Sequence, residues 1–499
     1  MLEIIQRDAM ARIGRLNTAH GNITTPTLMP VINPIDIFLT PKEMKKEFGA
    51  ELMMTNAYFT MRHFGEEGKK QGIHGILDYD GPVFTDSGGY QILRYGDVDA
   101  TPEEIVRYED AIAPDIATIL DIPTGVVENR GQAEETVRVT LERAKQGVQL
   151  RSNKKVMWCG PIQGGLFPDL VATSAREMGK LDFHVHAIGS PVELMEGYRY
   201  AELVELVMAA KQNLPLDRPV HLFGAGHPMM FSLAVAMGCD LFDSAAYVLY
   251  ARDGRYLTSE GTLRLDELLW FPCECPVCSE TTPEEMRKLP EKERVKLLAK
   301  HNLHVSFGEL RRIRQAIAEG RLWGIVQTRC RSHPRLLDGL RRLIQYSEFI
   351  ECFDQVTKPS AFYYSGEESA ERPEVTRHRR RLQERYEPPP LPTLALLPSF
   401  ENSMPDLEEP EQTHLVRLIP PFGVVPEELE EVYPLWQFDV PRELDKEQMR
   451  SVTESLERYL RKHGGKYKRV VLYNDEKRWS NLLVEACEPV REKLSVISL

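Results

Sequence analysis

Residues 84–91 read Phe84-Thr85-Asp86-Ser87-Gly88-Gly89-Tyr90-Gln91. The apolar residues before Asp86 predict a buried strand that delivers a carboxylate and a hydroxyl to its end. Gly88 and Gly89 can adopt positive φ and leave room for a ligand to approach the main chain. A strand followed by an ordinary surface turn would show the same pattern. The two interpretations differ in whether the arrangement recurs along the chain.

Short apolar runs alternate with helical segments from about residue 20 to residue 250. The eight runs are 28–32, 52–55, 83–85, 116–120, 156–159, 183–188, 220–223 and 241–242. Runs of this length and composition predict buried strands of a parallel sheet. The segment Thr101-Pro102-Glu103-Glu104 has the N-cap, proline and early acids of a helix start, and Ser190-Pro191-Val192-Glu193 repeats them. This alternation predicts an α/β fold, a (β/α)8 TIM-type barrel, with a doubly wound sheet as the alternative.

Polar residues and glycines repeatedly follow the predicted strands. They are Asp86, Asp121, Gln163, Gly189 with Ser190, Gly224 and Asp243. In a barrel these positions open onto the C-terminal rim, where active sites lie. Carboxylates and an amide suit a planar polar ligand such as a purine, and two carboxylates could serve as nucleophile and general acid/base at a sugar carbon. The alternative is that some of these acids cap helices or bind a cation.

Three of the eight cysteines, Cys273, Cys275 and Cys278, lie close together, and the other five are scattered. With His301 they predict a tetrahedral Cys₃His zinc site, and His304 is the competing fourth ligand. Three free buried thiols are the alternative. Four protein ligands leave no position for a metal-bound water, so the zinc would be structural and a zinc hydrolase is disfavoured.

The 499 residues predict two to four domains. The formal charge of −13 argues against a protein that coats nucleic acid indiscriminately, although it allows a local basic face. The sequence has no apolar stretch near the roughly 18 residues of a membrane span, and its first residues lack the pattern of a signal peptide. We therefore expect a cytoplasmic protein without membrane contact.

We expect three parts. Residues 1–365 would form the catalytic barrel with its zinc subdomain near 273–301, and 366–430 a basic segment, a proline- and acid-rich linker (387–412) and a connecting region. Residues 431–499 would form a small C-terminal α/β or α+β module, a candidate for RNA binding. The arginines at 377–381 are dense enough to suggest phosphate contact, whereas those between 311 and 342 also fit a solvated helix face.

Taken together and in order, these motifs resemble the tRNA-guanine transglycosylases over about residues 1–365. The matching pieces are 86–91, 163–165, 187–190, 240–243 and the Cys273/Cys275/Cys278/His301 set. The resemblance implies a zinc-bearing barrel, commonly a homodimer, that exchanges a guanine in tRNA for a 7-deazaguanine.

The resemblance also implies site residues. Asp243 would be the nucleophile on the ribose and Asp86 the general acid/base, with the reverse assignment left open. The base-binding residues would be Asp121, Gln163, Ser87, Gly189 and Ser190, with Tyr90 and Phe223 stacking on the base. The target guanine would have to leave its stack to reach them.

Residues 183–197 and 221–228 and the C-terminal extension are most similar to archaeal members. This implies insertion of 7-cyano-7-deazaguanine at position 15 of the D-arm, in archaeosine biosynthesis, through a covalent Asp–ribose intermediate. The alternatives are a bacterial-type exchange at the anticodon and a non-catalytic tRNA-binding subunit, which the presence of both Asp86 and Asp243 disfavours. Archaeal members often carry an RNA-binding PUA domain that is not evident here, so we expect either a separate PUA-containing protein or a C-terminal module that suffices.

Overall fold

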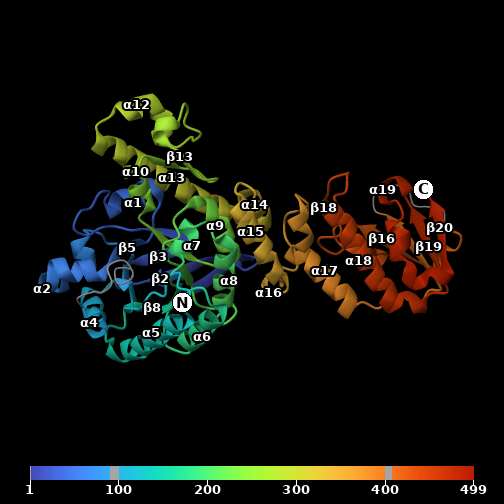
Figure 1. Cartoon of the computed structure of the whole chain (residues 1–499), viewed down its shortest axis with the longest axis horizontal. Coiled ribbons are helices and arrows are strands. Elements are labelled where there is room, and N and C mark those ends of the chain that lie inside the picture. The colour runs from blue at the N-terminus through green and yellow to red at the C-terminus, as the bar shows by residue number, and fades with distance from the viewer. Residues whose placement is uncertain (1, 90–99, 399–406) are drawn as a thin grey trace. The chain divides into compact units, whose positions relative to one another are not determined.

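The computed structural model describes residues 2–89, 100–398 and 407–499 (Figure 1). The chain divides into two compact units, Met1–Leu343 and Ile344–Leu499. The second unit begins before residue 365, the boundary that we expected, and includes residues 344–365. There β14 (Phe362–Tyr363) pairs with β18 (Phe438–Asp439). Among the described helices, none combines the length and apolar character needed to cross a bilayer.

Eight parallel strands form the core of the first unit. They are β4 (Thr27–Pro30), β5 (Met53–Asn56), β6 (Val83–Asp86), β7 (Ile116–Thr118), β8 (Met157–Ile162), β9 (Val185–Ile188), β10 (Val220–Leu222) and β11 (Leu241–Ser244). Their order is β4-β11-β10-β9-β8-β7-β6-β5, and a single bridge between Val31 and Met54 joins the two ends. The sequence prediction of a (β/α)8 barrel is confirmed, and each of the eight predicted runs overlaps a strand.

Helices follow the strands in turn. They are α1 (Pro41–Phe48), α2 (Ala57–Ile76), α4 (Pro102–Ile112), α5 (Arg130–Leu150), α6 (Pro168–Gly179), α7 (Val192–Glu196), α8 (Tyr200–Lys211), α9 (Phe231–Ala236) and α10 (Ala246–Arg252). Helix α4 begins as its sequence predicts, since Thr101 and Glu104 form a capping box around Pro102. These starts direct each helix back along the barrel, so that all strand ends of one kind meet at one rim.

A three-stranded antiparallel sheet closes the N-terminal end of the barrel. It consists of β1 (Leu2–Asp8), β2 (Ala11–Thr18) and β3 (Gly21–Thr25). Leu16 and Ile23 from this sheet are fully buried and pack with barrel residues such as Phe84 and Ile116. Side chains of this sheet therefore fill the N-terminal end of the barrel interior. In the described part of the chain, the opening for a ligand lies at the opposite rim, at the carboxyl ends of the strands.

After the last strand, the chain makes an excursion and returns along a long helix. Its elements are β12 (Arg255–Leu257), β13 (Thr262–Arg264), α11 (Pro276–Glu280), α12 (Pro283–Lys288), α13 (Glu291–Ala318), α14 (Leu322–Cys330) and α15 (Pro334–Leu343). In Figure 1, α12 lies at the top, on the far side of α13 from the strands. The arginines here are not all on a solvated face, because Arg314 donates to the carbonyls of Thr24 and Pro26.

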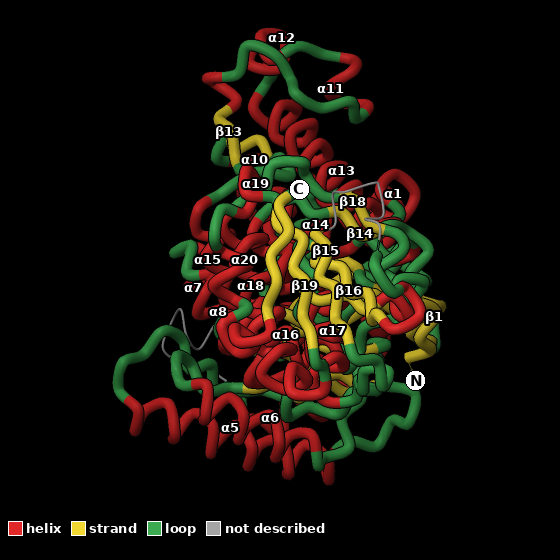
Figure 2. Tube along the Cα trace, turned by 90° about the vertical axis from the view of Figure 1, so that its right-hand side faces the viewer, coloured by secondary structure: helices red, strands yellow, loops and turns green. Residues whose placement is uncertain are grey.

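The second unit is built on a five-stranded mixed sheet of order β17-β16-β15-β19-β20, several strands of which lie side by side in Figure 2. The strands are β15 (Thr393–Pro398), β16 (Thr413–Ile419), β17 (Gly423–Pro426), β19 (Arg469–Asn474) and β20 (Leu494–Ser498), and the helices are α16 (Ser347–Glu351), α17 (Pro373–Glu384), α18 (Lys446–His463), α19 (Glu476–Trp479) and α20 (Leu482–Ala486). Leu394 and Leu396 of β15 pack with Leu456 of α18. The unit is an α/β module.

Two expectations for residues 366–430 differ from the structure. The segment expected to be a linker, 387–412, contains β15, whose alternate leucines are fully buried in the centre of the sheet. The arginines at 377–381 lie in α17, where Arg377 is buried, with Nε 2.8 Å from Glu351 Oε1 and Nη2 3.0 Å from Asp354 Oδ2. Arg380 also pairs with Glu351. Acids of the same unit therefore take up much of the charge that we expected to contact phosphate.

Candidate active site and metal centre

The rim at the carboxyl ends of the strands opens onto a cavity of about 1000 Å³. Seven of the residues expected from the sequence line it: Asp86, Asp121, Gln163, Gly189, Ser190, Phe223 and Asp243. Ser87 is fully buried, and its hydroxyl makes no hydrogen bond within the described chain. Tyr90 lies outside the described residues. Parallel strands thus bring three carboxylates and an amide from distant sequence positions to one site.

One oxygen of the Asp243 carboxylate, Oδ1, is held by described residues. Its Oδ1 lies 2.7 Å from Nε2 of the buried His221 and accepts a hydrogen bond of 2.7 Å from the main-chain N–H of Gly224. Since an ionised carboxylate only accepts, Nε2 of His221 carries the proton. No described residue bonds Oδ2, so this oxygen is the one available to a ligand.

Asp86 ends β6, and its bonds with described residues are likewise made through one oxygen. Oδ2 accepts hydrogen bonds of 2.8 Å from Asn56 Nδ2 and 3.2 Å from the N–H of Gly88, which has φ of +100°. Burial, followed by the charges of Asp121 and Asp243, raises the pKa of Asp86 to about 7. A carboxyl group with this pKa can give and take a proton near neutral pH.

The raised pKa predicts a pH-dependent effect of Asp86→Asn on stability. Between about pH 4 and pH 7 the folded protein keeps this proton and the unfolded chain has lost it, so wild-type stability falls as the pH rises. Asp86→Asn has no titrating carboxyl group at this position, so its stability does not fall with pH for this reason. We expect its Tm to gain on that of wild type from pH 4.5 to pH 7, by about 3 °C or more, and the difference to stay constant above pH 7.

Thermal unfolding monitored by circular dichroism across this range measures the difference. Asp78→Asn, which changes an exposed carboxylate, is the matched control and should show no such trend. A Tm difference for Asp86→Asn that is the same at pH 4.5 and pH 8 would contradict the prediction.

Asp121 and Gln163 form the next part of the wall. Gln163 Nε2 donates to Asp121 Oδ2 at 2.6 Å, whereas its Oε1 accepts from the N–H of Thr124 at 2.9 Å and from Ser190 Oγ at 3.0 Å. These contacts set the orientation of the amide. Burial raises the pKa of Asp121 to about 6, and the bond from Gln163 partly opposes this.

Two glycines allow the polar groups to come this close. A Cβ on Gly89 would lie 2.1 Å from Asp121 Oδ1, and a Cβ on Gly189 would lie 2.2 Å from Gln163 Nε2. Any larger residue at either position would displace the polar group beside it. Glycine at these two positions is therefore required by packing at the site.

Three residues that support the site were missed in the sequence. Asn56 ends β5 and binds Asp86, His221 lies in β10 and binds Asp243, and Thr124 binds Gln163. Asn56 follows the rule that polar residues at strand ends meet at the rim, so the run 52–55 could have pointed to it. No sequence pattern distinguishes His221 or Thr124, because their roles depend on which side chains face them.

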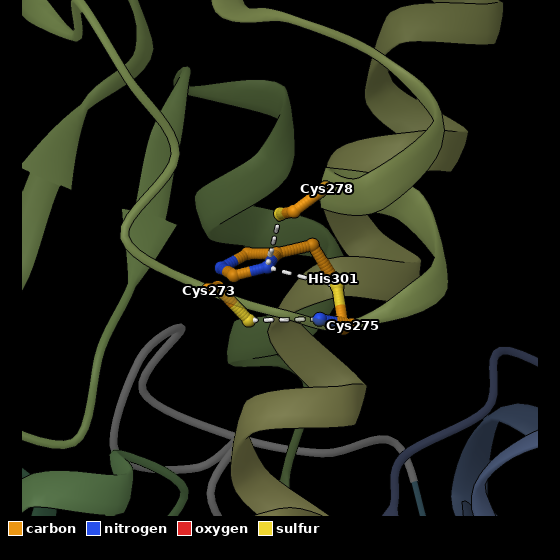
Figure 3. Close-up of side chains that lie close together, drawn as sticks. All are labelled: Cys273, Cys275, Cys278 and His301. Atoms are coloured by element: carbon orange, nitrogen blue, oxygen red, sulfur yellow. Dashed lines mark hydrogen bonds between the residues drawn. The ribbon is translucent and has the colours of Figure 1, made fainter.

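The four predicted metal ligands come together in the excursion after the barrel (Figure 3). Their ligand atoms all lie within 4.8 Å of one another, with His301 Nδ1 3.3 Å from Cys278 Sγ and 3.5 Å from Cys275 Sγ. Nε2 of His301 lies 2.9 Å from the carbonyl of Leu257 and so carries the proton, which leaves the Nδ1 lone pair for a metal. Three sulfurs and one nitrogen in this arrangement can hold a metal ion.

His304, the competing ligand, is directed elsewhere. Its Nε2 lies 3.6 Å from Glu47 Oε1, and its ring packs edge-on against Phe48. The choice of His301 in the sequence agrees with the group that the structure brings together.

Comparison with known proteins agrees with the family resemblance that the sequence motifs indicate. A family model described as queuine tRNA-ribosyltransferase matches residues 8–335, and one described as a domain of unknown function matches residues 375–498. The chain is 46% identical to the tRNA-guanine(15) transglycosylase of Methanosarcina mazei over 449 residues, which are 89% of this chain and 88% of that protein.

Two further relatives carry the same name. The protein of Methanococcus aeolicus is 46% identical over 451 residues, 89% of this chain and 69% of its own. That of Thermococcus kodakarensis is 50% identical over 383 residues, 76% of this chain and 65% of its own. The chain therefore belongs to the queuine tRNA-ribosyltransferase family, the tRNA-guanine transglycosylases, and is a pentosyltransferase.

Proposed function

We propose that this enzyme removes guanine from position 15 in the D-arm of tRNA and inserts 7-cyano-7-deazaguanine. The observation that carries the proposal is the meeting of Asp86, Asp121 and Asp243 in one cavity, in a chain 46% identical to relatives named tRNA-guanine(15) transglycosylase. Insertion of this base places the reaction in archaeosine biosynthesis.

Asp243 is the nucleophile. Its Oδ2 attacks C1′ of the ribose, the bond from C1′ to guanine N9 breaks, and an Asp–ribose ester forms. His221 and the N–H of Gly224 hold Oδ1, which directs the other oxygen of the carboxylate to the sugar. The reaction is a double displacement at one carbon, as in retaining glycosyl transfer.

Asp86 is the general acid and base. Protonated, it gives its proton to the departing guanine, and it then takes the N9 proton of the incoming base, whose nitrogen attacks C1′ and releases Asp243. A pKa of about 7 suits both steps because the group is present in both protonation states near neutral pH. One proton leaves with guanine and one is recovered, so the enzyme is unchanged.

The remaining residues bind the base. Asp121 accepts from the two N–H groups of the guanine edge, and the amide of Gln163 donates to its carbonyl oxygen. The N–H of Gly189 is bonded to the carbonyl of Ile162, so Gly189 contributes by leaving room beside Gln163. Ser190 orients Gln163, and Phe223 stacks on the base. From the family resemblance we also propose that Tyr90 stacks on the base and that Ser87 contributes to its binding. Each 7-deazaguanine shares this edge with guanine, so one pocket serves both.

The Cys273, Cys275, Cys278 and His301 site takes one structural zinc ion. The bound ion supplies a crosslink between the excursion and α13. From the family resemblance we also expect a homodimer, and a PUA-containing protein as a separate tRNA-binding partner.

Release of radiolabelled guanine tests the proposal. With 7-cyano-7-deazaguanine supplied, a tRNA labelled at position 15 should lose its label, and a tRNA with adenine at position 15 should react at least about 100-fold more slowly. A transcript labelled only in the anticodon loop is the control. Label loss from that transcript instead would indicate an anticodon enzyme, and tRNA binding without exchange on either would indicate a non-catalytic subunit.

A further inference from the structure

A second group of metal-binding side chains lies at the end of the barrel opposite the catalytic cavity. His20 stands in the turn between β2 and β3, His74 lies in the last turn of α2, and Asp115 directly precedes β7. One ligand atom from each lies within 4.8 Å of the others. Three segments distant in sequence thus bring two imidazoles and a carboxylate to one point.

Hydrogen bonds hold the Asp115 carboxylate in place without a bound ion. Asp115 is buried and accepts main-chain hydrogen bonds from Val83 at 2.9 Å and from His20 at 3.0 Å. Val83 is the first residue of β6, so Asp115 is anchored to the barrel floor. Fixed ligands of this kind lower the ordering that metal binding requires.

His74 presents a lone pair to this carboxylate. Its Nδ1 lies 3.2 Å from the carbonyl of Tyr79, and since a carbonyl only accepts, Nδ1 carries a proton. In the neutral ring Nε2 is then an acceptor, 3.5 Å from Asp115 Oδ2, and it makes no hydrogen bond with any described residue. Two acceptors that face each other without a donor favour a cation between them.

The distances agree with a metal site. His20 Nδ1 lies 3.1 Å from Asp115 Oδ1, close to the 3.5 Å between His74 Nε2 and Oδ2. Tetrahedral bonds of about 2.0–2.1 Å place neighbouring ligand atoms about 3.4 Å apart. The Cys₃His group shows the same spacing, 3.3 and 3.5 Å. The His20 side chain is 38% exposed, so an ion can enter and a water can complete the shell.

We propose that His20, His74 and Asp115 form a second metal site, which binds a divalent transition-metal ion such as Zn²⁺ and fastens the β2–β3 hairpin to the barrel floor. Two imidazoles and a carboxylate suit zinc and its neighbours and not calcium or magnesium. The site lies at the N-terminal ends of the strands, the face that serves stability in barrels of this kind. It is therefore structural and takes no part in base exchange.

Metal content of the full-length protein, equilibrated with Zn²⁺ and then desalted, tests the proposal. Wild type should hold two zinc ions per chain, and the double variant His20→Gln/His74→Gln one. Titration of Co²⁺ into protein that holds one zinc ion per chain at the Cys₃His site, after a mild chelator has emptied the His20/His74/Asp115 site, provides a second readout. It should give ligand-field absorption without a thiolate charge-transfer band, and this absorption should be absent in the double variant.

His63→Gln, which changes an exposed histidine in the same helix α2, is the matched control and should keep both ions. If the double variant does not fold, His20→Gln alone, at the exposed turn, replaces it. One zinc per chain in wild type with no Co²⁺ uptake would overturn the proposal and leave a simple ion pair. Equal metal content in wild type and the double variant would also overturn it.

Discussion

The Asp243→Asn variant should bind tRNA with a Kd within about threefold of wild type and lose base exchange by at least about 10³-fold. An amide is a poor nucleophile and cannot form the ester with C1′, whereas the contacts of Oδ1 with His221 and Gly224 can be retained by the amide oxygen. The expected effect is therefore on the chemical step and not on binding. Guanine release under single-turnover conditions and a filter-binding assay measure the two quantities separately.

The covalent intermediate separates the roles of the two carboxylates. Without an incoming base, wild type should accumulate a protein–tRNA adduct that survives denaturing electrophoresis, and Asp243→Asn should form none. Asp86→Asn should form the adduct slowly, because it lacks a proton to give to the departing guanine. Adduct formation by Asp243→Asn and none by Asp86→Asn would reverse the assignment. Asp217→Asn, an exposed carboxylate, is the control and should behave as wild type.

Loss of the Cys₃His site should have the largest effect on stability. Cys278→Ser should remove one equivalent of zinc per chain and unfold the segment around residues 268–290, because α11 and α12 are helices of five and six residues with little core of their own. Structural zinc sites in small modules contribute on the order of 10 kcal/mol to folding. Limited proteolysis should therefore cut this segment at least about tenfold faster.

Cys352→Ser, which changes an exposed thiol of the second unit, is the matched control. It should keep the zinc and the proteolysis rate of wild type. If Cys278→Ser retains its zinc, or loses zinc and remains resistant to protease, the metal does not hold this segment. Hydrogen exchange across residues 268–290 locates the change independently.

The sequence was informative where local pattern and tertiary role coincide. The eight strands could be predicted because each is a short apolar run followed by a helix start, and a barrel places every strand end at the same rim. Asp86, Asp121, Gln163 and Asp243 followed from that rule alone. The cysteine spacing and His301 required no knowledge of the fold beyond the coordination chemistry of zinc.

The predictions that were wrong, and the site residues that were missed, share one physical cause. Each depends on partners that only the folded chain brings into contact. The segment 387–412 is rich in proline and acid, yet six of its residues form β15, because the run of prolines at 388–392 ends just before the strand and Leu394 and Leu396 are buried in the core. Arg377 was predicted to contact phosphate because of the charge density at 377–381, but it pairs with the buried acids Glu351 and Asp354. His221 and Thr124 have partners that only the folded barrel brings to them.

The barrel wall has one weakly paired joint, the contact between strands β4 and β5. Between β4 and β5 the parallel ladder is reduced to the bridge at Val31 and Met54 and the 2.7 Å bond from the N–H of Ile32 to the carbonyl of Met54. Each of the other neighbouring strand pairs has at least two paired residues. Several residues of this joint, among them Ile32 and Asn56, border the catalytic cavity. The joint lies between β4, paired with β11 and its Asp243, and β5, paired with β6 and its Asp86, so a change in the spacing of β4 and β5 alters the separation of these two carboxylates.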